Sequence, residues 1–125
     1  MALAAKMSAL ANDPGAMAVL KKDRTSAANW VSIRFLADYI TYAPAIEPAD
    51  FDICPVLLTQ PEQDRWTPYD VSTPVLDRIT RVPVDVVTLA GAGHLPLEEP
   101  GLTQLATAVA GFIEKVTSVE ALTES

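Results

Sequence analysis

The chain has 125 residues, half of them apolar, which is enough for one domain with a hydrophobic core. Nine Lys and Arg residues against sixteen Asp and Glu residues give a net charge of −7, a field that repels phosphate backbones and anionic lipid heads. We therefore expect no nucleic-acid partner and no membrane association. A single cysteine and a single histidine exclude an intramolecular disulfide and the usual zinc sites, so we expect a cytoplasmic protein with no metal and no cofactor.

The first part of the chain, 1–52, is predicted to be helical. Apolar residues at helical spacing come first, and Asn12–Pro14 then supplies a cap and a first-turn proline for a second helix that ends near Lys22. From Ser26 a third helix is expected, because apolar residues fill two of its faces. Residues 42–52 contain two prolines and are predicted to form an irregular connection.

The second part, 53–125, is predicted to alternate strands and helices. The continuous apolar run 55–59 is typical of a strand covered on both faces, and 84–89 forms the second strand. A helix expected after Thr67–Pro68 connects them, which makes the two strands parallel. The pair Glu98–Glu99 is expected to cap a final amphipathic helix, whose apolar face comprises Leu102, Leu105, Val109, Phe112 and Val116. The fold class is therefore α/β, in the order βαβα after the helices.

Two side chains with acid–base chemistry follow the predicted strands. Asp64 lies in the loop after the first strand, and His94, the only histidine, follows the second. The carboxyl ends of parallel strands share the edge at which open α/β sheets bind ligands, so we expect these side chains to lie close together. A carboxylate that accepts from one ring nitrogen leaves the other nitrogen free to take a proton from a nucleophile. The spacing thus predicts the acid and base of a catalytic triad, with turn residues as the structural alternative.

These segments resemble the C-terminal part of serine-type α/β-hydrolases. The family has a strand of the form P-V-L-L before an acid loop, and later a segment similar to G-H-x-x-x-x-E-x-P. Here "PVLLTQPEQDRWTP" contains Asp64 and "GAGHLPLEEPG" contains His94, in the family order of nucleophile, acid and base. Pro61 departs from the family, which usually has glycine there. The resemblance implies a helical lid-like segment over 1–52, and over 53–125 the C-terminal βαβα half of an α/β-hydrolase core that acts on a small-molecule substrate, esters by default.

The nucleophile of such an enzyme is missing from the sequence. None of the five glycines flanks a serine in the pattern G-x-S-x-G, and Cys54, at the start of the first predicted strand, is expected to be a buried structural cysteine. That strand has the character of an interior strand, yet its outer edge is expected to be unpaired. We therefore expect an incomplete domain, and a truncated gene product, a cloned fragment and one chain of a split enzyme all fit this expectation.

Two functions from different classes follow. In the first, the chain is half of a hydrolase in which His94 is the general base and then the acid, Asp64 is its orienting carboxylate, and a serine from missing sequence is the nucleophile. Such a chain is inactive alone. In the second, the chain is a non-catalytic hydrolase remnant that dimerises or binds a partner through its open strand edge or apolar helices. Trp66 either lines a substrate pocket or covers the edge of the sheet.

Overall fold

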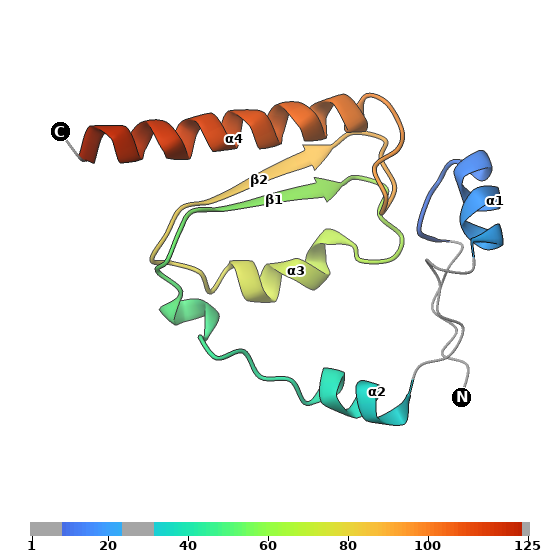
Figure 1. Ribbon diagram of the computed structural model, residues 1–125, viewed down its shortest axis with the longest axis horizontal. Coiled ribbons are helices and arrows are strands. Elements are labelled where there is room, and N and C mark those ends of the chain that lie inside the picture. The colour runs from blue at the N-terminus through green and yellow to red at the C-terminus, as the bar shows by residue number, and fades with distance from the viewer. Residues whose placement is uncertain (1–8, 24–31, 124–125) are drawn as a thin grey trace.

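The computed structural model of the protein describes residues 9–23 and 32–123, with side chains up to 118. Within these ranges it is a mixed α/β structure with two parallel strands and four α-helices, which confirms the predicted α/β class (Figure 1). The elements, in chain order, are α1 (Pro14–Lys22), α2 (Ile33–Ile40), the short 3-10 helix η2 (Pro48–Asp50), β1 (Val56–Pro61), α3 (Tyr69–Leu76), β2 (Val84–Leu89) and α4 (Gly101–Thr123).

Local capping signals fix where the two N-terminal helices begin. The carboxylate of Asp13 caps α1 by accepting from the amide of Ala16, with Pro14 in the first turn and Lys22 in the last, as predicted. The hydroxyl of Ser32 caps α2 in the same way. Because Ser32 has extended backbone angles and α2 begins at Ile33, the predicted third helix does not run unbroken from Ser26, and this prediction is wrong. Residues 24–31 and the apolar residues before position 9 lie outside the described residues, so the first predicted helix stays a prediction.

The two strands pair in parallel from Val56 opposite Val84 to Pro61 opposite Leu89. The amide of Val56 donates to the carbonyl of Pro83, and the amide of Glu62 donates to the carbonyl of Leu89, both at 3.0 Å. Alternate residues of a strand in a parallel pair direct their backbone groups to opposite sides, so the N–H and C=O groups of residues 57 and 59 point away from β2. In the described part of the chain no strand pairs with that edge, as predicted.

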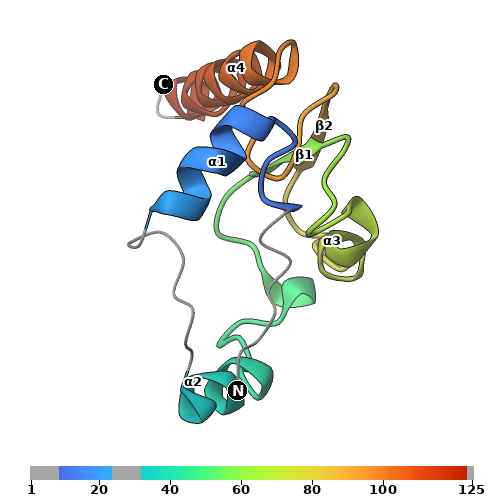
Figure 2. The ribbon, with the colours of Figure 1, turned by 90° about the vertical axis from the view of Figure 1, so that its right-hand side faces the viewer.

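Helix α4 lies across one face of both strands, and the shorter α3 lies on the other side of the sheet (Figures 1 and 2). The half-buried residues of α4 include Leu105, Phe112 and Val116, which face the sheet as predicted. The side chains of Leu102 and Val109 are instead 42% and 40% exposed, so this part of the predicted apolar face is wrong. None of the described helices combines the length and the apolar character that crossing a membrane requires.

The buried core is small for a chain of this mass. Its apolar members among the described residues are Ala9, Ala11, Met17, Leu89 and Ala92. Several large apolar side chains are instead exposed, notably on α2 and α4 (Ile33, Phe35, Tyr39, Ile40, Leu102, Val109 and Ile113). The described residues therefore present a large amount of apolar surface.

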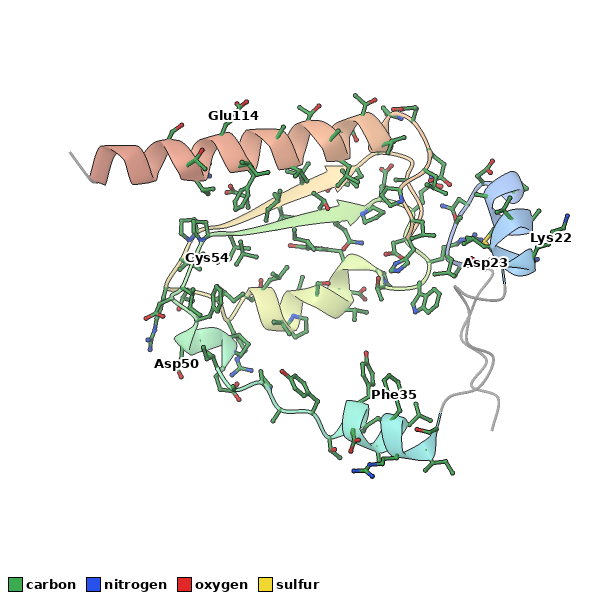
Figure 3. The ribbon with its side chains drawn as sticks, in the orientation of Figure 1. Lys22, Asp23, Phe35, Asp50, Cys54 and Glu114 are labelled. Carbon is green, nitrogen blue, oxygen red and sulfur yellow. The ribbon has the colours of Figure 1, made fainter. Side chains whose placement is uncertain are left out.

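Exposed ion pairs join the connection between α2 and β1 to the turn that precedes β2. Arg78 contacts Glu47 at 2.8 Å between Nη2 and Oε2, and Arg81 pairs with Asp50. Figure 3 shows Asp50 and Cys54 near the amino-terminal ends of the strands, opposite the ends from which the loops with Asp64 and His94 leave. Cys54 is exposed, so the prediction of a buried cysteine is wrong.

The start of α4 requires glycine at position 101. A Cβ atom there would lie 2.6 Å from the Cβ of Ala92 and 3.0 Å from the carbonyl oxygen of Ala90. We expect Gly101→Ala to lower the free energy of unfolding by about 1–3 kcal/mol through overpacking, measured by urea denaturation. Gly111→Ala is the control, because its Cβ would meet nothing within 4 Å and alanine favours the helix by about 0.5–1 kcal/mol. Equal stability changes in the two variants would contradict the close packing.

Candidate active site

The two strands end side by side, and their following loops are joined by further hydrogen bonds. The amide of Gln63 donates to the carbonyl of Ala92 at 2.9 Å, which continues the pairing beyond the strands. Gly91 has φ of +68°, a conformation that favours glycine, and its amide donates to a carboxylate oxygen of Glu62 at 2.8 Å. These bonds hold the Asp64 loop and the His94 loop against each other.

The structure brings Asp64 and His94 into contact, as the sequence predicted. Oδ2 of Asp64 lies 2.9 Å from Nδ1 of His94, and the Asp64 side chain is 3% exposed. Oδ1 accepts from the amides of Trp66 at 2.8 Å and Thr67 at 2.9 Å. The hydroxyl of Thr67 donates to Oδ2 at 2.9 Å. The carboxylate is thus held by its own loop before it meets the imidazole, and Pro61 does not turn it away from His94.

The pKa of Asp64 lies below its ordinary value of 3.8. Burial by itself raises the pKa, but the hydrogen bonds from His94, from the amides of Thr67 and Trp66 and from the Thr67 hydroxyl together outweigh it. Asp64 is therefore an ionised acceptor at neutral pH.

An ionised carboxylate can only accept, so Nδ1 of His94 carries a hydrogen and donates it. The Thr67 oxygen lies 3.2 Å from the same nitrogen and can share this hydrogen, because its own hydrogen is directed to Asp64. The His94 side chain is 32% exposed, and no described residue forms a hydrogen bond with Nε2. This arrangement can take a proton from a group that approaches Nε2 and stabilise the resulting positive charge.

Trp66 lies against the imidazole. Its ring and that of His94 are stacked, with 5.3 Å between centroids and 27° between planes. The half-buried indole therefore restricts the rotation of His94 and forms a wall beside it. The predicted contact of Trp66 with a substrate stays a prediction.

A cavity of about 240 Å³ lies next to these residues. It is lined by four consecutive residues of β1, 58–61, together with Asp64, His94 and side chains of α3 and α4. Successive side chains of a strand point to opposite faces, so a cavity that touches four in a row faces the edge of the strand rather than one side of the sheet. The open edge of β1 and the imidazole thus border the same space.

The sequence analysis did not predict the contacts of two residues in this region, Thr67 and Glu98. The spacing of Asp64 and Thr67 is that of a side chain capping a turn three residues later, a local signal that was available. Glu99 caps α4 as predicted, accepting from the amide of Thr103 at 3.2 Å. The Glu98 carboxylate instead accepts from residues 12, 13 and 93, so its predicted capping role is wrong. No local pattern reveals a donor 86 positions away.

No cluster of three or more His, Cys, Asp and Glu side chains within residues 9–23 and 32–123 is suited to hold a metal ion.

Low pH is expected to destabilise the protein through two carboxylates. Burial raises the pKa of Glu98, but hydrogen bonds, foremost from the Gly93 amide, hold it below its ordinary value of 4.5, as described above for Asp64. A carboxylate whose pKa is lower in the folded than in the unfolded protein stabilises the fold at pH values above its pKa in the unfolded protein. This contribution is lost as the pH falls through its pKa in the folded protein. We expect the free energy of unfolding to decrease below about pH 4.5 in urea titrations. Asp64→Asn should show a shallower decrease, and the same slope in both proteins would contradict the assignment.

No family model matches the chain, and the comparisons with curated proteins and with solved structures found no match either. The contact of Asp64 with the only histidine, at the open edge of the sheet, is the feature of the chain that bears most directly on its function.

Proposed function

We propose that this chain supplies the acid and base of a serine-type α/β-hydrolase, with 53–125 as the C-terminal βαβα half of its core. The observation that carries the proposal is the distance of 2.9 Å between Asp64 Oδ2 and His94 Nδ1 at an edge shared by two parallel strands. In this role Nε2 takes the hydroxyl proton of a serine as its oxygen attacks the carbonyl carbon of an ester. The alcohol then leaves with that proton, and water repeats the sequence on the acyl-enzyme.

The serine and the oxyanion donors come from sequence outside these residues, because the pattern G-x-S-x-G does not occur among them. The open edge of β1 is suited to receive the strand that precedes them. Residues 57 and 59 direct their backbone groups outward, and the cavity beside this edge reaches His94. Pro61 has no N–H, so pairing with an added strand ends there, level with the loops that hold the site.

The helical segment 1–52 is proposed to act as a lid. Exposed apolar side chains of α2 (Ile33, Phe35, Tyr39 and Ile40) form a surface of the kind that covers an apolar substrate or packs on the completed core. Trp66, stacked on the imidazole, is proposed to line the substrate site.

The test compares the 125-residue chain with a longer protein that includes the coding sequence upstream of Met1. A fluorophosphonate probe reports an activated serine, and p-nitrophenyl acetate reports turnover. We expect neither labelling nor turnover with the chain alone and both with the longer protein. A longer protein that is folded and as inactive as the chain would refute the proposal.

The large exposed apolar surface supports a second candidate, a non-catalytic module that associates with another copy or another protein. Light scattering over a range of concentrations measures self-association, and hydrogen exchange measures the cover on the edge of β1. Association in which the amides of residues 57 and 59 become protected would support this function. A monomer in which both amides are already protected would contradict the hydrolase function and any association through the strand edge, since both require an open edge.

A further inference from the structure

The carboxylate of Glu98 connects two segments that are far apart in the sequence. Its Oε1 accepts from the amides of Asn12 at 3.1 Å and Asp13 at 3.0 Å. Its Oε2 accepts from the amide of Gly93 at 3.1 Å, the residue immediately before His94. Hydrogen bonds to an ionised acceptor are stronger than those between neutral groups. Glu98 is thus the point at which the segment before α1 is attached to the His94 loop.

The same segment, 9–13, holds both loops of the candidate site. The amide of Leu95, the residue after His94, donates to the carbonyl of Leu10 at 2.8 Å. The side-chain amide of Asn12 donates to the carbonyl of Gln63, next to Asp64, at 3.2 Å. His94 therefore lies between two backbone amides that both have a partner. The amide of Gly93 donates to Glu98, and the amide of Leu95 donates to segment 9–13.

Packing leaves this segment little room to move. Ala9 and Ala11 are 3% and 1% exposed. A Cβ atom at Gly93 would lie 3.0 Å from the side chain and 3.1 Å from the backbone nitrogen of Asn12, so the two backbones approach closely. Burial raises the pKa of Glu98, but its hydrogen bonds lower the pKa by a larger amount. The carboxylate therefore stays ionised at neutral pH.

We propose that Glu98 is a positioning residue that, by joining segment 9–13 to the amide of Gly93, holds the His94 ring with Nδ1 toward Asp64. The purpose of this orientation rests on the proposed function, but the orientation itself can be measured without catalysis. Glu98 and Glu99 provide a matched pair, because the same side chain at the next position only caps α4 through Thr103.

The experiment uses the single histidine of the tag-free 125-residue chain. The ring nitrogens of His94, observed by two-bond ¹H–¹⁵N NMR, report which nitrogen carries the hydrogen, and hydrogen exchange reports the amides of residues 12, 13 and 93. In Glu98→Gln we expect about tenfold faster exchange of these amides, since a hydrogen bond to a charged group is lost. We also expect the Nε2–H tautomer to appear beside the Nδ1–H form. Glu99→Gln should change neither.

Unchanged ring signals in Glu98→Gln, together with faster amide exchange, would show that Glu98 only stabilises the fold and would overturn the proposal. Unchanged exchange would overturn it as well, because the attachment itself would then be absent. If circular dichroism shows that Glu98→Gln does not fold, Glu98→Asp, which withdraws the carboxylate by one methylene, is measured with the same expectations. An inactive longer protein whose His94 still responds to Glu98→Gln would count against the hydrolase function alone.

Discussion

Replacing Asp64 with alanine is expected to lower the free energy of unfolding by about 3 kcal/mol. The substitution leaves the amides of Trp66 and Thr67 without their acceptor in a place where the side chain is 3% exposed. It also removes the partner of Nδ1 of His94. Urea denaturation at pH 7, followed by circular dichroism, measures the change.

Asp52→Ala is the control for this prediction. Asp52 lies 4.0 Å from Arg81, its side chain is 66% exposed, and exposed ion pairs contribute little to stability. We expect a change within about 0.5 kcal/mol for this variant. If the two alanine variants are equally stable, Asp64 does not organise its loop in the way that the hydrogen bonds indicate.

If the proposed hydrolase function is correct, replacing His94 with glutamine in the longer protein is expected to lower kcat for an ester by about 10⁴-fold or more. Glutamine can fill much of the space of the imidazole, but it cannot take a proton at neutral pH. Asp64→Asn should produce a loss of similar size, because an amide can donate to Nδ1 and so favours the wrong tautomer of the ring. Steady-state kinetics with p-nitrophenyl acetate measure both losses.

Glu114→Gln, on the exposed side of α4, is the matched substitution that should leave kcat unchanged. Substantial turnover in the His94 variant would mean that another group is the base. A loss confined to KM would mean that His94 binds the substrate without transferring a proton.

Much of the fold could be predicted because its signals are local. The cap Asp13 and the proline after it define the start of α1, and two apolar runs define the strands. The contact of Asp64 with His94 then follows from topology, since parallel strands deliver their following loops to one edge. No side-chain detail was needed for that step.

Other features depend on groups that are distant in the sequence. The role of Glu98 depends on donors at residues 12 and 13, which nothing near position 98 reveals. The burial of α4 depends on the width of the sheet. Two strands together are about 10 Å wide, no wider than one helix, so only one stripe of α4 can touch them. Leu102 and Val109 have the apolar character that the prediction used, but they remain 42% and 40% exposed.

The Asp64–His94 pair is self-contained within the two loops that follow the strands. Its hydrogen bonds come from the pair itself and from Trp66 and Thr67, two and three residues after Asp64. The exposed apolar side chains of α2 take part in none of them. Substitutions on that helix are therefore expected to alter the outer surface of the molecule while the pair itself persists.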